Sequence, residues 1–220
     1  MQPLIEANWG DTVQITVHNK ISNPEEGTSL HGHGISHQQE GWEDGVPAVS
    51  QCPISPGQSY TYQFRATPHG SSWYHSHYSS QYADGLWGPL VIHGPSSASY
   101  DLDLGPVALS DHFYRGYTEI VEDVVGKDLK KVRPASDNNL INGKMDSRCT
   151  TDTEACSTNA GISRFNFTSG KRHRLRLVNS GVQSIQHFSI DSHPMTVIAK
   201  DWIPTKPYQT NLVTLAVSEH

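Results

Sequence analysis

The chain has 220 residues, of which 35% are hydrophobic and 17% are charged, a composition typical of a soluble globular protein with one large or two modest domains. A formal net charge of −6 argues against nucleic acid as a partner, because nucleic-acid-binding proteins favour basic patches. The sequence contains no apolar run long enough to cross a bilayer, which argues against a membrane-spanning helix.

The first half of the chain alternates apolar and polar side chains in short segments. Residues 12–18 read TVQITVH and residues 59–65 read SYTYQFR, and this period of two predicts half-buried strands. The predicted strands of this half are residues 12–18, 29–35, 59–65, 71–78 and 89–93. Turn signals such as Asn23-Pro24 and Pro56-Gly57 recur between them. Short strands with frequent turns predict an all-β fold, a Greek-key sandwich or barrel.

A small, polar stretch at residues 94–99 indicates a domain boundary, so we expect a first domain at 1–95 and a second at 96–220. The elements predicted in the second domain are a short helix at 117–129, a loop entered at 140–143, and strands at 174–179, 186–190 and 195–199. This half therefore also has a predominantly β character.

Two H-x-H pairs are the strongest chemical signal in the sequence. They are His31 with His33, and His75 with His77. Residues i and i+2 of a strand share one face, so each pair directs two imidazoles the same way. If the two strands are neighbours, four imidazoles converge, and neutral imidazole is a ligand for Zn, Cu, Fe and Ni. The alternative interpretation is a set of surface histidines on a polar strand face.

The order of the motifs around these pairs identifies a family. They are HGHGI at 31–35, DGVP at 44–47, QCPI at 51–54, PG at 56–57, WYHSH at 73–77 and DGLWGPL at 84–90. The run resembles the first domain of a fungal multicopper oxidase, and most closely an ascomycete laccase. The resemblance covers nearly the whole chain and implies a cupredoxin-like first domain that is nearly complete, followed by a truncated second one. Gly32 stands where the family usually has Trp, so we expect lost packing behind the ligands.

The resemblance also implies roles for the histidines. His31 matches a ligand of the type-2 copper, and His33, His75 and His77 match ligands of the type-3 copper pair. The other histidines of that trinuclear cluster come from a third domain in the family, and their motifs are absent from this sequence. No Cys of this chain sits between histidines, as the type-1 copper requires. The chain is expected to supply half of a trinuclear site.

Asp84 has two interpretations. It matches a family carboxylate near the copper cluster, which implies a general-acid role in passing protons to reduced oxygen. The alternative is a turn residue, because Asp84-Gly85 is a common turn dipeptide.

Three cysteines and one glycosylation sequon bear on the compartment. Family members imply a disulfide between Cys149 and Cys156, with two free thiols as the alternative, and a bridge from Cys52 to the third domain. Asn166 begins the only N-glycosylation sequon. The N-terminus lacks the features of a signal peptide, yet the resemblance implies a secreted protein, so a mature fragment, a trimmed chain or a truncated gene product is expected.

Three functions remain open at this point. The first is a portion of a laccase-like oxidase, which as a complete enzyme would oxidise phenols by one-electron steps and reduce dioxygen to water with copper. The second is a non-enzymatic β-domain that binds Cu or Zn through four histidines. The third is an inactive, truncated remnant.

Overall fold

The structure is a computed structural model that describes residues 2–145 and 161–220. The expected Cys149–Cys156 disulfide lies outside the described residues. Among the described residues, no helix has both the length and the apolar character that a membrane crossing requires. The chain divides into two compact units: residues 2–95 with 201–203 form one, and residues 96–200 with 204–220 form most of the other.

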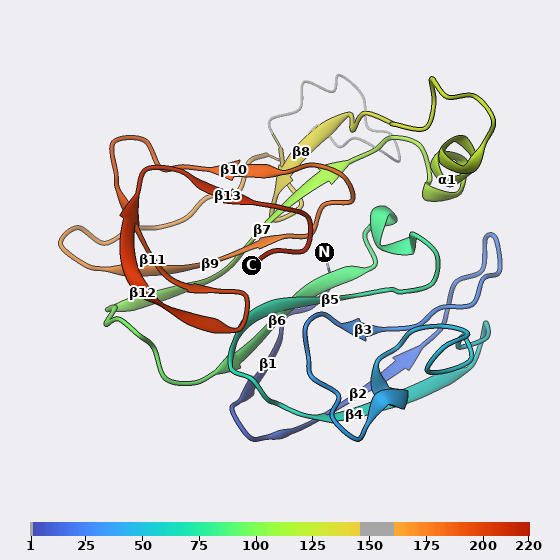
Figure 1. Ribbon diagram of the computed structural model, residues 1–220, viewed down its shortest axis with the longest axis horizontal. Coiled ribbons are helices and arrows are strands. Elements are labelled where there is room, and N and C mark those ends of the chain that lie inside the picture. Colours follow the sequence, from blue (N-terminus) through green and yellow to red (C-terminus); the bar gives the residue numbers. More distant parts are fainter. Residues whose placement is uncertain (1, 146–160) are drawn as a thin grey trace. The chain divides into compact units, whose positions relative to one another are not determined.

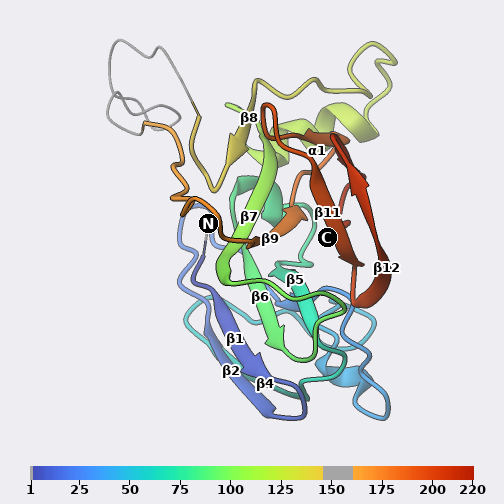
Figure 2. The same ribbon diagram turned by 90° about the vertical axis from the view of Figure 1, so that its left-hand side faces the viewer.

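The unit of residues 2–95 contains two sheets (Figures 1 and 2). The first has the strand order β1-β6-β5-β3, and the second pairs β2 with β4. The strands are β1 (Ile5–Asn8), β2 (Thr12–His18), β3 (His31–Gly32), β4 (Ser59–Arg65), β5 (Gly70–His75) and β6 (Trp87–His93). Two short 3-10 helices lie between strands: η1 (Gly41–Glu43) and η2 (Gln81–Asp84).

The alternation read in the sequence explains how this unit is held together. Strands β2 and β4 pair antiparallel, with Val13 opposite Phe64 and Ile15 opposite Tyr62, so their apolar residues lie on one face. That face packs on side chains from the other sheet, including Leu90 of β6. The buried members of this core are Leu30, Ile35, Ile54, Tyr62, Phe64, Ala66, Tyr74, Leu90, Ile92 and Trp202. Two sheets therefore enclose one apolar core, as in a sandwich.

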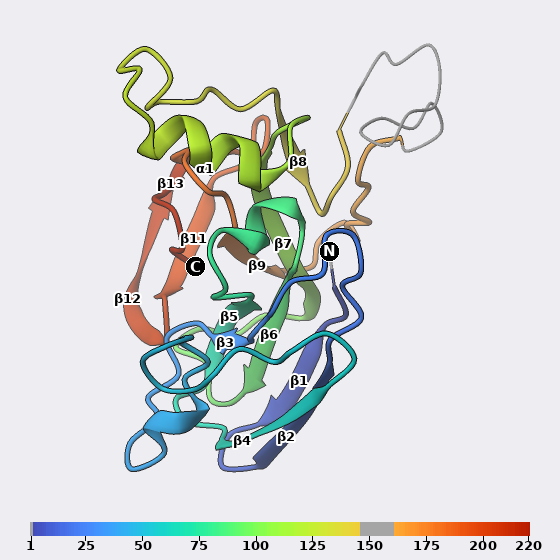
Figure 3. The same cartoon turned by 90° about the vertical axis from the view of Figure 1, so that its right-hand side faces the viewer.

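Strands are also the main regular structure of the other unit (Figures 1 and 3). Its elements are β7 (Leu102–His112), α1 (Tyr117–Val125), β8 (Asn138–Ile141), β9 (His173–Asn179), β10 (Gln186–Phe188), β11 (Met195–Lys200), β12 (Ile203–Thr210) and β13 (Val213–Leu215). The sheet β8-β7-β9 is accompanied by the pairs β10-β13 and β11-β12. Val107 and Leu109 of β7 pack with Leu215 of β13 in a small apolar core.

The all-β prediction is confirmed, and its errors are local. The loop expected at 140–143 is wrong in part, because Asn138–Ile141 is strand β8, hydrogen-bonded to β7. The helix expected at 117–129 ends earlier, at Val125. Strands β1, β7, β12 and β13 were not predicted.

An ion pair between a buried arginine and a more exposed carboxylate ties β9 to β7. The Arg176 guanidinium is almost fully buried and donates from Nη2 to Asp103 Oδ2 at 2.6 Å and from Nε to both carboxylate oxygens. Burial raises the pKa of the Asp103 carboxyl, but its hydrogen bonds from Arg176 and the Gly105 amide outweigh that effect, so the pKa lies below its ordinary value. Asp103 therefore stays charged opposite the guanidinium.

We predict that Asp103→Asn lowers the free energy of unfolding by about 3–5 kcal/mol, because it leaves a buried guanidinium without its carboxylate. Urea unfolding at pH 7 measures the loss. Asp101→Asn is the matched control, since Asp101 pairs with the exposed Lys171 and Arg172 at 3.9 Å and should change stability by about 1 kcal/mol at most. The contribution of Asp103 should be present above pH 3.8, the ordinary pKa of the carboxyl, and be lost as the pH falls through the lower folded-state pKa. Equal losses for both variants would contradict the prediction.

Candidate metal centre

The pairing of β3 with β5 brings the two histidine motifs together. These strands are antiparallel, and their register places His31 directly opposite His75. Side chains opposite each other on an antiparallel pair project from the same face of the sheet. The two imidazole centroids are accordingly 5.3 Å apart. A pair of histidines distant in the sequence thus becomes one cross-strand pair.

The second histidine of each motif lies just beyond its strand. Strand β3 ends at Gly32 and β5 ends at His75, so the strands are shorter than the predicted 29–35 and 71–78. Gly34 turns the chain with a φ of +72°, but the His33 amide still donates to the Trp73 carbonyl at 3.0 Å. His33 therefore stays beside β5 although it is outside the ladder.

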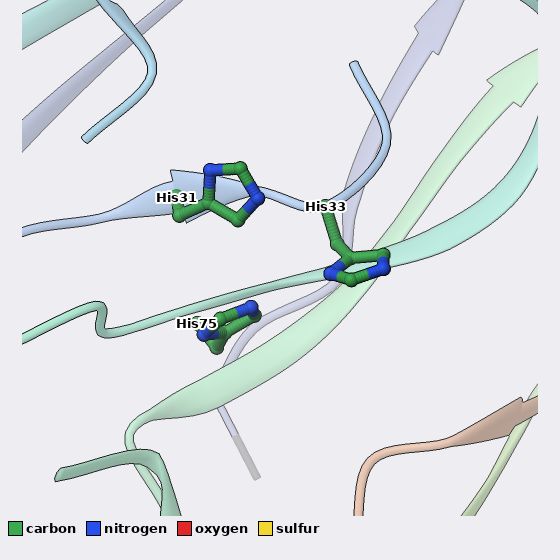
Figure 4. Close-up of side chains that lie close together, drawn as sticks. All are labelled: His31, His33 and His75. Atoms are coloured by element: carbon green, nitrogen blue, oxygen red, sulfur yellow. The ribbon is translucent and has the colours of Figure 1, made fainter. Parts of the chain in front are cut away.

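All four imidazoles gather in one place. The His31 centroid lies 5.8 Å from that of His33 and 5.4 Å from that of His77, and the His75 and His77 centroids are 5.9 Å apart. Figure 4 shows the rings of His31, His33 and His75 turned toward a common point. One ring nitrogen from each of these three lies within 4.8 Å of the others. His77 is exposed and lies at the edge of this group.

Hydrogen bonds fix which nitrogen of each ring faces the cluster. His31 Nδ1 donates to the Asp44 carbonyl at 2.6 Å and also lies 3.2 Å from an Asp44 carboxylate oxygen. His75 Nδ1 donates to the Ser76 carbonyl at 2.9 Å. Because a carbonyl oxygen only accepts, Nδ1 of each ring carries the proton and Nε2 keeps its lone pair. Such an outer hydrogen bond is the usual support of a metal-binding histidine.

The surroundings of His75 favour the neutral form of its ring. Burial lowers the pKa of His75 from 6.5 to about 3, and the neighbouring imidazoles of His31, His33 and His77 lower it further against the opposing bond to Ser76. Trp73 stacks on the His75 ring with centroids 4.2 Å apart. His75 is therefore an uncharged imidazole at neutral pH, which is the form that binds a metal.

Asp84 is the last residue of η2, a 3-10 helix that meets the cluster through Tyr82. The ring of Tyr82, in the same helix, is 5.3 Å from the His75 ring. Gly85 caps η2 in the left-handed conformation, with a φ of +96°. The turn interpretation thus describes the backbone of Asp84, and its general-acid role stays a prediction.

Sequence reasoning missed Asp44 as a partner of His31. In the sequence, Asp44-Gly45 is part of the DGVP motif at 44–47 and has the form of a turn dipeptide. A Cβ on Gly45 would lie 2.0 Å from the Leu30 carbonyl oxygen, and Gly45 has a φ of +76°. Only glycine lets this loop approach the residue that precedes His31 so closely. The Asp-Gly dipeptide was the available signal, but it does not reveal which strand the loop touches.

A small cavity lies beside Gly32, where Ile35 takes up part of the space, since a Cβ on Gly32 would lie 3.3 Å from Ile35 Cγ1. Gly32 lines a cavity of about 10 Å³, together with apolar and aromatic residues that include Phe64 and Tyr74. This is near the smallest volume that holds one water molecule. His37 also lines the cavity, and burial lowers its pKa. A small void therefore lies beside the residue that joins His31 to His33.

The donor set fits copper. Three imidazoles from two neighbouring strands place a nitrogen each within 4.8 Å of one another, at least one of them is held neutral by burial, and imidazole is a ligand that suits copper and zinc. The site is thus a histidine-only cluster of the kind that binds a transition metal.

Comparison with known proteins defines the class. Two domains described as multicopper oxidase match residues 1–97 and 103–220. The chain belongs to the multicopper oxidase family. It is 43% identical to dihydrogeodin oxidase of Aspergillus terreus and 42% identical to Laccase-2 of Botryotinia fuckeliana, each over 99% of this chain. It covers 35% and 36% of those proteins, so it spans about a third of their length.

Solved structures agree with this assignment. The laccase from Botrytis aclada is 41% identical and superposes with a TM-score of 0.86 over 99% of this chain and 39% of that one. A multicopper oxidase that functions in iron import is 30% identical with the same TM-score, over 99% of this chain and 38% of its own. These neighbours confirm the cupredoxin-like fold, and the family's cofactor is copper.

We predict that Gly45→Ala destabilises the protein and weakens metal binding, because the added methyl group displaces the Leu30 carbonyl next to His31. Gly57→Ala is the matched control: Gly57 has nearly the same φ, +75°, but a Cβ there meets nothing within 4 Å. Gly57→Ala should cost about 1–2 kcal/mol of unfolding free energy, and Gly45→Ala clearly more. Thermal unfolding and copper titration of both variants test this, and equal effects would refute it.

Proposed function

We propose that this chain supplies one half of the trinuclear copper site of a laccase-like oxidase. The observation that carries the proposal is the β3–β5 register, which sets His31 against His75 and gathers His33 and His77 around them. We assign His31 to the type-2 copper, and His33, His75 and His77 to the type-3 pair. The remaining ligands would come from a third cupredoxin domain outside these 220 residues.

Copper held by these residues would supply the one-electron redox chemistry that couples oxidation of a phenolic substrate to reduction of dioxygen. The residues of this chain hold and orient the ligands. Asp44 and the Ser76 carbonyl fix the tautomers of His31 and His75, and burial keeps His75 uncharged. We propose that the Asp84 carboxyl, at the end of η2, holds a proton beside the cluster and gives it to reduced oxygen.

The compartment follows from the same proposal. We infer a secreted glycoprotein, because an oxidising compartment suits a Cys149–Cys156 disulfide. Asn166 of the sequon is exposed, as a glycosylation site must be. Cys52 is an exposed free thiol, and we propose that it bridges to the third domain.

A second candidate function is a non-enzymatic Cu or Zn site within this chain. The mutual distances of the His31, His33 and His75 nitrogens favour it, since three or four imidazoles suffice for either metal. The oxidase portion and the non-enzymatic metal site would differ in catalytic turnover and not in metal affinity.

We predict that the isolated 220-residue chain binds Cu(II) but does not oxidise phenols faster than free copper does. The sequence offers no cysteine between histidines to accept the first electron, and four cluster histidines leave each metal open to water. His33→Ala and His77→Ala should each weaken copper binding by about tenfold or more. Titration against a competing chelator measures the affinity, and oxygen uptake with a phenol measures turnover.

His187→Ala is the control, because His187 is exposed, bonds Thr214 in the other unit and should leave affinity unchanged. Native-like affinity in both cluster variants would contradict the proposed ligands. An intense blue thiolate-to-copper band, or oxygen uptake abolished by His77→Ala, would contradict the predicted inactivity of the isolated chain.

A further inference from the structure

A buried amide connects the two histidine motifs. Gln81, the first residue of η2, is 4% exposed. Its Oε1 accepts from Thr28 Oγ1 at 2.9 Å and from Ser76 Oγ at 2.8 Å. Its Nε2 donates to Glu26 Oε2 and to the Gly27 carbonyl, both at 2.9 Å. Both ends of the amide are bonded, so a side chain that would be costly to bury is held in one orientation.

The residues bonded to Oε1 belong to both ligand segments. Thr28 begins the segment that runs to His31, and its backbone is anchored by two hydrogen bonds to Ile54. Ser76 separates His75 from His77. One oxygen atom of Gln81 therefore fixes the distance between the two motifs at a point beyond the β3–β5 ladder.

Every polar group of Ser76 is engaged. Its amide donates to the Leu86 carbonyl at 2.9 Å, and its carbonyl accepts from His75 Nδ1. Its hydroxyl accepts from the Tyr78 amide at 3.1 Å and gives its one proton to Gln81. If that proton lost its acceptor, the fully buried hydroxyl would need another partner, and a shift of the segment to supply one would move the carbonyl that orients the His75 ring.

The hydrogen bonds of Gln81 stabilise a segment that the sheet does not hold in place. Strand β5 ends at His75, so no ladder bond holds residues 76–77 against β3. The hydrogen bonds of Gln81 act on this segment just after the strand. An outer hydrogen-bond partner that orients a ligand commonly changes metal affinity by about 10–100-fold when it is removed.

We propose that Gln81 is a positioning residue for the copper site: through Thr28 and Ser76 it sets the spacing of the two histidine motifs and the orientation of His75. The inference rests on the proposed copper-binding role of the four histidines. It assigns no contact between Gln81 and the metal.

The first test is Gln81→Met, which keeps the side-chain length and removes the hydrogen bonds. Cu(II) affinity should fall about 10–100-fold, and the electron paramagnetic resonance spectrum of the bound Cu(II) should change its hyperfine splitting. Asn179→Leu is the matched control: Asn179 is 0% exposed, and its amide donates to the carbonyls of Ser184 and Leu215 in the other unit. It should lose thermal stability while keeping the affinity and the spectrum.

A second test works even if Gln81→Met does not fold. Gln81→Glu sets a carboxylate against Glu26, whereas the double variant Gln81→Glu with Glu26→Gln restores an amide–carboxylate pair with the positions exchanged. The single variant should weaken copper binding and alter the spectrum. The double variant should regain most of the native copper affinity and of the native spectrum. If the side chain of Gln81 only filled space, the single and the double variant would give the same result, because Gln and Glu have the same volume.

The outcomes separate the two proposals. If the native chain binds no copper, the proposed function fails. If the native chain binds copper and Gln81→Met and Gln81→Glu both retain its affinity and spectrum, the positioning role fails while the proposed function stands.

Discussion

The candidate site depends on one strand pairing. Strand β3 is only two residues long, yet its register against β5 decides whether His31 meets His75 or faces away from it. A shift by one residue would turn His31 to the opposite face of the sheet. Two residues cannot hold a register alone, so residues outside the β3–β5 ladder stabilise the pairing. Gly45 lets the 44–45 loop lie against the Leu30 carbonyl, and Gln81 bonds the flanking segments.

The sequence predicted the strands whose pattern is local. Residues 12–18 and 59–65 alternate apolar and polar side chains, and they form β2 and β4 with those bounds. The loop expected at 140–143 includes the turn-forming pair Asn142-Gly143, but pairing with β7 makes the residues just before it, Asn138–Ile141, strand β8. Strand β12 carries Pro204 and Pro207 and was not predicted. It pairs with β11 alone, and prolines are tolerated in such an edge position.

The gathering of the four histidines was predicted, and the residues that hold them in place were not. Two H-x-H pairs on β segments gave the four histidines, and the family resemblance gave copper. The contact of Asp44 with His31 and the bonds of Gln81 to both motifs join residues far apart in the sequence. Spacing within a motif carries no information about such long-range partners. The strand argument itself held for His31 and His75 only, since His33 and His77 lie past the ends of their strands.

The two histidine motifs lie far apart in the sequence, and this separation links folding of the chain to metal binding. Loop-closure entropy opposes the pairing of β3 with β5, and the pairing brings no benefit until the core of Leu90, Tyr74 and Phe64 has formed around it. An unfolded chain offers a metal only the separate His31/His33 and His75/His77 pairs. A metal that binds the four gathered imidazoles more tightly than the separate pairs adds that difference in binding free energy to the stability of the folded chain.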